Sequence, residues 1–514
     1  FDHSNGWIEN HYLNMDKHAN KYNDRKTSGF LLYKPTDELS AKLTVTDNYK
    51  KKYFMDVVTI TDPNIDISSI KRKDGENVNF DVPTYETIKV KSQALNLSYE
   101  LEKIKLESVT THKKTNFIGD YDTDYKANNN DDGLRQYNYA DIDTWTQELK
   151  LSSKNQDIKW VTGLYFDKEE RDQGPYGEDR FYNLNDGTGT YVPGIYHSNS
   201  DSLTNSKTYA IFGQTMIPLG ESFELTLGGR YQKIKKDISA DVRQTFTNTL
   251  HYQLPNFNYS NEKTWNSFLP KAALSYKIND NLTTYASISK GYMPGGFNFF
   301  PSSTSDADNT FEAQKSINYE IGAKYIGDNF AINTAIFRMD IKDIHIYKID
   351  PITNNYATDN AKKAHSQGIE IDGTYFLTDN WSVSGAVGLV QAKYDDYDGG
   401  VRKYDGEKVE NTPNYTASLG ISYLADSGLY GRVDLSARGT TYYYDAVKHE
   451  MLKDDGGIIS NAKIGYKLKD WDIYSYITNI TDEGYVAGYS AKEGFVVAGF
   501  NEPRRFGIGA IYKF

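Results

Sequence analysis

Polar and apolar residues alternate along the stretch from Trp265 to Phe300. In its first half, Ala272, Leu274 and Tyr276 fall on one face, and mostly polar or small residues fall on the other. A second alternating segment follows the turn at Ile278–Asn281, whose Asn and Asp residues tolerate left-handed backbone angles. Period-two alternation is the signal of a β-strand with one apolar face. The stretch therefore predicts a β-hairpin followed by a long, aromatic, glycine-rich loop.

The rest of the chain repeats this plan, with short polar turns inside hairpins and long polar loops between them. Short turns are predicted at Lys34–Glu38, Glu102–Lys103, Asn155–Asp157, Gly220–Glu221, Gly327–Asn329, Thr378–Asn380, Ala425–Gly428 and Lys469–Asp470. One long loop is predicted from Asp172 to Asn205. The pattern predicts roughly 19 strands. Short turns at one end and long loops at the other are typical of an all-β, transmembrane antiparallel β-barrel.

Charged residues lie on one face of many predicted strands, opposite a face of Ile, Leu, Val and Tyr. Because a lysine or arginine that faces lipid at mid-membrane costs about 2–4 kcal/mol, these charges are expected to face the lumen. They are Glu224, Arg230, Glu320, Lys324, Glu370, Asp372, Arg432, Asp434 and Arg438. The lumen is therefore expected to be wide and polar, either wet or packed against a polar plug. The alternative, solvated faces of a soluble β-sandwich, accounts for one strand but not for so many long hairpins.

Composition is consistent with a barrel and excludes several other classes. The 514 residues include 43 Tyr, and the mean hydropathy is −0.67. The chain has no run near the roughly 20 apolar residues that a membrane helix needs, whereas tyrosine suits interfacial girdles and aromatic loops. The absence of cysteine excludes disulfides, thiolate metal sites and a cysteine nucleophile. A net charge of −12 argues against nucleic acid as a partner.

Motifs for catalysis or cofactor binding are not found in the sequence. Ser287 and Lys290 match the S-x-x-K spacing, but that motif needs a helix and these residues lie on a predicted strand. His197 and His365 lie in predicted loops where a haem ligand could sit, although such isolated histidines are usually solvated. We therefore expect no enzyme activity, no catalytic residue, no bound metal and no cofactor.

Several segments resemble TonB-dependent outer-membrane receptors of the siderophore-receptor type. YASISKGYMPGGFN (Tyr285–Asn298) looks like a hallmark segment of that family. In the downstream FEAQKSINYEIGAKY stretch, Glu320, Gly322 and Lys324 match the family's pattern, while Gln314 replaces its first Glu. The late strands and the aromatic C-terminal strand ending at Phe514 are also similar. The resemblance is specific over the second half of the chain and rests on the strand pattern alone in the first.

The resemblance implies a barrel of about 22 strands around an N-terminal plug, in a Gram-negative outer membrane that the chain crosses many times. Residues 1–514 would all belong to the barrel, with the plug and about three strands upstream of Phe1. The implied partners are a ferric siderophore or similar ligand, TonB acting through the missing N-terminal region, and outer-membrane lipid and lipopolysaccharide. Within the family, haem, cobalamin, nickel complexes or a saccharide remain alternative cargos. A passive porin, which needs neither plug nor TonB, and a surface adhesin remain alternatives outside it.

Substrate contacts are expected on long loops above the lumen, because loops carry specificity on a rigid scaffold. Arginine can neutralise an anionic iron chelate, and aromatic rings can stack on it. Two predicted loops carry that chemistry, one with Arg171, Tyr176, Arg180, Phe181, Tyr182, Tyr191 and Tyr196, the other with Tyr292, Phe297, Phe299 and Phe300. The alternative is that these aromatic residues pack loops together or belong to the outer girdle.

Overall fold

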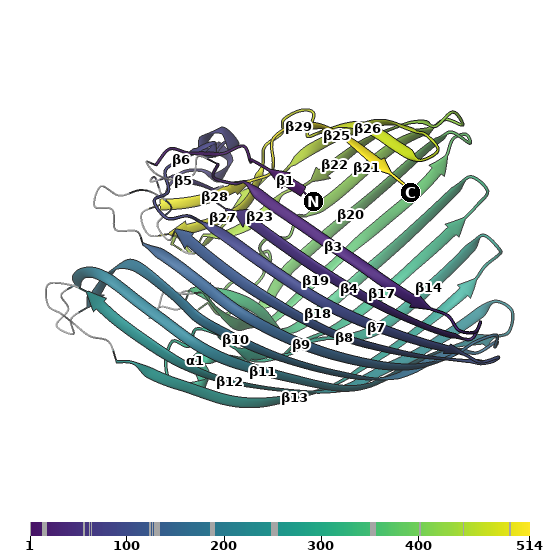
Figure 1. The fold of residues 1–514 in the computed structure, drawn as a ribbon, viewed down its shortest axis with the longest axis horizontal. Helices are drawn as coiled ribbons and strands as arrows, with labels where there is room; N and C mark the ends of the chain where they lie inside the picture. The colour runs from purple at the N-terminus through teal and green to yellow at the C-terminus, as the bar shows by residue number, and fades with distance from the viewer. Residues whose placement is uncertain are drawn as a thin grey trace.

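The computed structural model of the chain is built almost wholly of β-strands (Figure 1). It describes residues 2–12, 18–54, 57–60, 62, 64–122, 125, 127, 134–185, 191–247, 255–349, 356–399, 402–445, 447–492 and 495–513. Its helices are short, namely the 3-10 turns Ile67–Ser69 (η1) and Arg72–Gly75 (η2) and the α-helix Asp306–Asn309 (α1). In this part of the chain no helix has the length and apolar character needed to cross a membrane.

Twenty strands form one antiparallel sheet. Its long strands are β3 (Tyr22–Tyr33), β4 (Leu39–Tyr53), β7 (Tyr85–Glu100), β8 (Ile104–Asp122), β9 (Arg135–Ser153), β10 (Lys159–Asn185), β11 (Tyr191–Leu219), β12 (Phe223–Thr247), β13 (Phe257–Lys277), β14 (Leu282–Met293), β17 (Gln314–Ile326), β18 (Phe330–Ile349), β19 (Tyr356–Phe376), β20 (Trp381–Asp396), β21 (Tyr415–Leu424), β22 (Leu429–Arg438), β25 (Gly457–Lys467), β26 (Trp471–Thr478) and β29 (Arg505–Tyr512). Each pairs with the next in this order, and the three-residue β1 (Asp2–Ser4) pairs with β3. The predicted number of strands is confirmed.

The sheet curls into a barrel-shaped wall, in which the starts of β3 and β29 approach each other. Figure 1 shows the purple β3 and the yellow β29 on neighbouring parts of the wall, diverging toward their far ends. Arg505 of β29 also interacts with the side chain of Tyr22 of β3. The predicted all-β transmembrane barrel architecture is therefore confirmed, with the strands tilted strongly across the wall (Figure 1).

The short connections lie at one end of the barrel and the long ones at the other (Figure 1). The turn between β13 and β14 follows the chemistry expected for it, because the side chain of Asn279 accepts hydrogen bonds from the backbone N–H groups of Asn281 and Leu282, both at 2.9 Å. The other short turns lie between the strands that the sequence predicts. We refer to these two ends as the short-turn end and the long-loop end.

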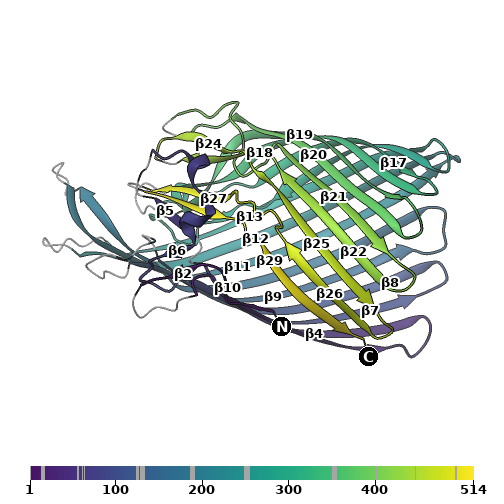
Figure 2. The same ribbon diagram turned by 90° about the horizontal axis from the view of Figure 1, so that it is seen from above.

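The predicted loop from Asp172 to Asn205 is wrong. The strands β10 and β11 remain paired as far as Asn185 and Tyr191, with one register shift between Gln173 and Tyr176. Figure 2 shows this blue hairpin reaching beyond the rest of the long-loop end. Polar residues occur on both faces of the extension among the aromatic ones, so hydropathy alternation cannot reveal it. The strands are maintained by backbone pairing with β9 and β12.

Four small sheets are built from the long loops. They are β2 (Glu9–Asn10) with β6 (Asn77–Val78), β15 (Gly296–Phe297) with β16 (Thr310–Phe311), β23 (Thr441–Asp445) with β24 (Glu450–Asp454), and β27 (Val486–Lys492) with β28 (Phe495–Phe500) and β5 (Val57–Ile60). The last sheet joins the loop after β4 to the loop before β29. It therefore links the two ends of the barrel wall.

An ion pair between a buried arginine and a more exposed aspartate reinforces this connection. Arg72 is 8% exposed, and its Nη2 lies 2.6 Å from Oδ1 of Asp482. Its Nη1 donates a hydrogen bond of 2.7 Å to the backbone carbonyl of Glu483. Below the pair, Val58 of β5 and Val496 of β28 pack in one apolar cluster. We call the β5–β28 pairing together with the Arg72–Asp482 pair the clasp.

The outward face of the wall carries an apolar band. On β11, outward-facing Tyr209, Ile211 and Leu219 are all exposed, and alternate residues point inward. The ten residue steps from Tyr209 to Leu219 rise about 34 Å along a strand, or about 25 Å along the barrel axis at a tilt near 45°. That height matches the hydrophobic band of outer-membrane barrels.

Candidate functional site

The inward face of the wall is polar, and it carries the charges predicted for the lumen. Side chains of two strands that have a third strand between them can touch only on the concave face, because side chains converge there. Such contacts therefore identify the inward face. The guanidinium of Arg230 lies 5.0 Å from the ring centre of Tyr165, from β12 to β10, and Arg432 reaches Ser384, from β22 to β20. Strand alternation from these positions places Glu224, Arg230, Glu320, Lys324, Glu370, Asp372, Arg432, Asp434 and Arg438 on the inward face.

Several of these charges are held by neighbours in the wall. The hydroxyl of Tyr285 donates a hydrogen bond of 2.6 Å to Glu320, and Arg432 pairs with Asp434 at 2.7 Å. Arg438, at the long-loop end, pairs with Asp454 at 3.1 Å. Paired charged groups and hydroxyl groups therefore line the lumen and make its surface polar.

The loop of residues 294–313, between β14 and β17, folds against the inward face at the long-loop end. The ammonium group of Lys236 on β12 donates a hydrogen bond of 2.9 Å to the carbonyl of Gly295. Farther along, the backbone N–H of Thr358 on β19 donates to the side-chain oxygen of Asn298 at 2.9 Å. These contacts fix both flanks of the 294–313 loop against the wall.

The predicted residues Arg171 and Phe299 come together inside the barrel. The guanidinium of Arg171 lies 4.3 Å from the ring centre of Phe299, and its Nε donates a hydrogen bond of 2.9 Å to Gln173. The Oγ of Ser200 donates to the carbonyl of Phe299 at 3.4 Å, which places this ring against β11. Phe299 remains 37% exposed, so one part of the ring is open toward the lumen. A planar cation on an aromatic ring can bind an anionic or aromatic ligand.

Tyr176 and Phe300, also predicted, form the adjoining contact. Their ring centres lie 5.3 Å apart in an edge-to-face arrangement, and Gln136 donates a hydrogen bond of 3.1 Å to the Tyr176 hydroxyl. Phe300 is only 8% exposed. The geometry makes this pair a support for the neighbouring Arg171–Phe299 contact.

Other predicted contact residues serve packing. Phe297 is 5% exposed and lies in an apolar cluster with Trp265 and Ile238, against which Tyr292 also packs. Tyr196 is likewise 5% exposed. The side chains of Arg180, Phe181, Tyr182 and Tyr191 lie outside the described part of the structure. The structure thus brings Arg171, Tyr176, Phe299 and Phe300 together, and it places Phe297, Tyr292 and Tyr196 in loop packing.

The two histidines expected in loops lie on strands. His197 belongs to β11 and its Nδ1 lies 2.9 Å from Asp179, whereas His365 belongs to β19 and lies 2.7 Å from Asp395. Among the residues that the structure describes, no group of three His, Cys, Asp or Glu is arranged to hold a metal ion. Carboxylate partners hold both imidazole rings.

A second aromatic cluster, which the sequence did not single out, lies near the ends of β20 and β23. The rings of Tyr397 and Tyr404 stack at 5.0 Å, and the hydroxyls of Tyr404 and Tyr444 share a hydrogen bond of 2.7 Å. Burial raises the pKa of Tyr397 to about 12, so its phenol stays neutral. Only the density of tyrosine from 394 to 444 signals this cluster in the sequence, and Tyr404 is 2% exposed. We assign it to loop packing.

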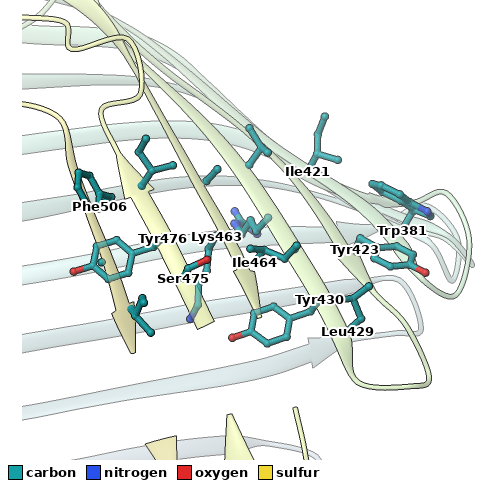
Figure 3. A pocket seen from close by; sticks show the side chains of 17 residues that line it. Trp381, Ile421, Tyr423, Leu429, Tyr430, Lys463, Ile464, Ser475, Tyr476 and Phe506 are labelled. Carbon is teal, nitrogen blue, oxygen red and sulfur yellow. The ribbon is translucent and has the colours of Figure 1, made fainter. Parts of the chain in front are cut away.

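An apolar hollow on the outward face is not a site for a polar cargo. Figure 3 shows side chains of Ile421, Leu429, Ile464 and Phe506 around it. Trp381 lies at its short-turn end, with its ring 4.7 Å from that of Tyr423. Aromatic residues at this depth match an interfacial girdle, so the hollow faces lipid chains.

Comparison with known proteins identifies similar sequences and folds. The family model described as "TonB dependent receptor-like, beta-barrel" matches residues 11–480. The chain is 24% identical over 332 residues to the pesticin receptor of Yersinia pestis, covering 63% of this chain and 46% of that protein. It is 22% identical over 367 residues to the ferric enterobactin receptor of Pseudomonas aeruginosa, covering 62% of this chain and 44% of that protein. The matched region thus spans less than half the length of these relatives.

The fold is similar to a solved structure over the whole chain. The ferric yersiniabactin uptake receptor of Yersinia pestis superposes with a TM-score of 0.81 at 18% identity, covering 100% of this chain and 74% of that one. At this identity the likeness concerns the fold. It agrees with the barrel built above from strand pairing and from the apolar band.

Proposed function

The chain belongs to the TonB-dependent receptor β-barrel family, and from this premise we propose that the intact protein imports a ferric siderophore complex across the outer membrane of a Gram-negative bacterium. Residues 1–514 supply the transmembrane wall and the extracellular loops. TonB is the energy-coupling partner, acting through a region N-terminal to the barrel. The protein acts as a transporter and not as an enzyme.

One observation carries the proposal most directly, namely the Arg171–Phe299 pair at the long-loop end of the lumen. Its guanidinium can neutralise an anionic chelate, and its partly exposed ring can contact an aromatic one. The Tyr176–Phe300 pair supports it from behind. Below it, the paired charges of the inward face offer a polar route along the lumen.

The similar proteins support the cargo class. A pesticin receptor, a ferric enterobactin receptor and a ferric yersiniabactin uptake receptor all appear among the matches. Two of these three names state a ferric siderophore as the ligand. Haem, cobalamin, a nickel complex or a saccharide would be carried by the same barrel with different loop contacts.

Radiolabelled iron uptake by cells that express the intact protein tests the proposal. We expect uptake of at least one ferric siderophore from a catecholate, hydroxamate and mixed panel, and its loss when TonB is deleted or the proton gradient is collapsed. Equal uptake with and without TonB would replace the proposal with a passive porin. No uptake across the panel would contradict the siderophore assignment, and radiolabelled haem, cobalamin or saccharide would then identify the cargo.

A further inference from the structure

A row of short hydroxyl side chains runs along the inward face of β11. Their inward direction follows from the register, because alternate positions from Phe212, the partner of the luminal Arg230, fall on one face. Six consecutive inward positions are serine or threonine, namely Ser198, Ser200, Ser202, Thr204, Ser206 and Thr208. The first three are almost fully buried, at most 4% exposed. We call these six residues the hydroxyl row.

Several hydroxyl groups of the row have no hydrogen-bond partner. Within the described part of the chain, the side-chain oxygens of Ser198, Ser202 and Thr204 are buried and make no hydrogen bond. The hydroxyl of Ser200 is used, since it donates to the carbonyl of Phe299. A buried hydroxyl without a partner costs stability, and native structures seldom keep one unless another group completes the site. The neighbouring Ser202 and Thr204 therefore point to a ligand that accepts hydrogen bonds.

Arg171 lies directly across from these two residues. It is the register partner of Thr204, and Gln173, which accepts a hydrogen bond from its Nε, is the register partner of Ser202. The Cβ atoms of residues placed opposite each other on one face are about 4.5–5.5 Å apart. Among the residues that the structure describes, no carboxylate forms an ion pair with Arg171. A half-buried cation without a counter-ion thus adjoins two unpartnered hydroxyl groups.

The surrounding charges restrict where an anion can bind. Glu169 lies one inward position closer to the short-turn end on β10, and it accepts a hydrogen bond of 3.3 Å from Thr144. Across β11, Lys236 donates to the carbonyl of Gly295. An anionic group is therefore attracted at the level of Arg171 and repelled at the next level, where Glu169 lies.

We infer that Arg171, Ser202 and Thr204 bind a carboxylate of the cargo that is not coordinated to iron. A planar guanidinium pairs with both oxygens of a carboxylate, and the hydroxyl groups donate to the lone pairs that remain. Oxygens bound to iron have fewer lone pairs free, and a neutral hydroxamate complex lacks the charge. The inference rests on the proposed function and narrows its cargo to ferric siderophores with a free carboxylate. We call these three residues the carboxylate subsite.

Equilibrium binding to the detergent-purified intact protein tests the inference. The probes are ferric aerobactin, in which two carboxylates remain off the iron, the diamide made from these carboxylates, ferric citrate, a ferric tris-catecholate and a ferric trihydroxamate. We expect a carboxylate-bearing complex to bind most tightly, and the diamide to bind about tenfold or more weakly than ferric aerobactin. In R171Q the acid and the diamide should bind within about twofold of each other, because the guanidinium no longer distinguishes them.

The hydroxyl row offers a matched control. The test variant S202A/T204V removes both unpartnered hydroxyl groups, and we expect its affinity for ferric aerobactin to fall by about fivefold while its affinity for the diamide stays within about twofold. Thr208→Val makes the same change on the same face of β11, opposite Asp167 and outside the carboxylate subsite. We expect Thr208→Val to leave both affinities unchanged. Correct folding of each variant is checked by the heat-dependent shift of the intact barrel on gels.

Three results would overturn the inference. They are equal binding of the acid and the diamide by the unsubstituted protein, an equal loss of both probes in S202A/T204V, and tight binding of only the tris-catecholate or the trihydroxamate. The second result would give the two hydroxyl groups a structural role. The third would leave the proposed function standing with another class of siderophore. Binding of none of the probes, together with no uptake across the panel, would remove both proposals.

Discussion

At the scale of single residues, the Arg171–Phe299 pair shows what a sequence can and cannot assign. Both residues are recognisable as candidates because a cation and an aromatic ring suit an anionic chelate. Their contact at 4.3 Å depends on the 294–313 loop folding inward, which no local pattern encodes. The same chemistry also selected Phe297, which the structure buries beside Trp265. Composition cannot separate a ring that contacts ligand from a ring that packs.

We expect Arg171→Ala to weaken ferric siderophore binding by about tenfold, because it removes a positive charge and a cation–π contact worth about 0.5–2 kcal/mol. Arg171→Lys should give an intermediate loss, since it keeps the charge but not the planar stack. Equilibrium binding of the ferric complex measures both. Arg402→Ala is the control, because Arg402 lies over the ring of Tyr404 at 4.5 Å in a different loop. Unchanged binding by Arg171→Ala would remove this residue from the proposed site.

At the scale of elements, local signals predict the hairpins well and the loop structure poorly. Alternation and Asn or Asp turns are local, so the turn at 278–281 follows directly from its residues. The extension of β10 and β11 to Asn185 and Tyr191 is not predicted, because polar and aromatic residues are mixed on both of its faces. The clasp is not predicted from the sequence for a different reason. Its residues Val58 and Val496 come from loops near opposite ends of the chain, and local patterns carry no information on such contacts.

We expect Asp482→Asn to loosen the clasp, because it leaves the buried Arg72 guanidinium without its anion. Asp482 has a φ of +57°, which Asn also tolerates, so the substitution isolates the charge. Loss of one charge-assisted contact in a partly exposed pair should cost about 1–2 kcal/mol of local stability. Hydrogen exchange at β5 and β28 measures it. Asp434→Asn, which breaks a luminal pair, should leave that exchange unchanged.

Acid should open the clasp in the same way. The backbone N–H of Arg504 and the nearby Arg72 lower the pKa of Asp482 below its usual value. A carboxyl group whose pKa is lowered on folding contributes stability above its unfolded pKa and loses it as the pH falls through its folded pKa. Exchange at β5 and β28 should therefore be pH-independent at neutrality after correction for the intrinsic rate, and should accelerate below about pH 4. An equal acid response in Asp482→Asn would assign the effect to another group.

At the scale of the whole molecule, the distribution of turns fixes the orientation in the membrane. The short turns lie at one end, and in barrels of this kind short turns face the periplasm. Residues 1–514 contain no cysteine, so single cysteine reporters can be placed at chosen positions in them. We expect an impermeant thiol reagent on intact cells to label cysteines at Pro294 and Val447 and to miss those at Asp328, Asp379 and Ser427. Labelling at Asp379 from outside would reverse the orientation. Asp186, the other expected external position, lies outside the described residues.

The clasp also has a consequence for the order in which the protein is built. Arg72 and Asp482 are separated by 410 positions in the chain, and most of the barrel strands lie between them. Closing so long a segment has a high cost in conformational entropy. This cost falls once the intervening hairpins have paired, because they bring the two ends close together. The clasp is therefore among the last contacts to form during biogenesis. Protection of the β5 backbone amides from hydrogen exchange would therefore indicate a completely assembled barrel. In a chain stalled during insertion, the same amides would exchange freely.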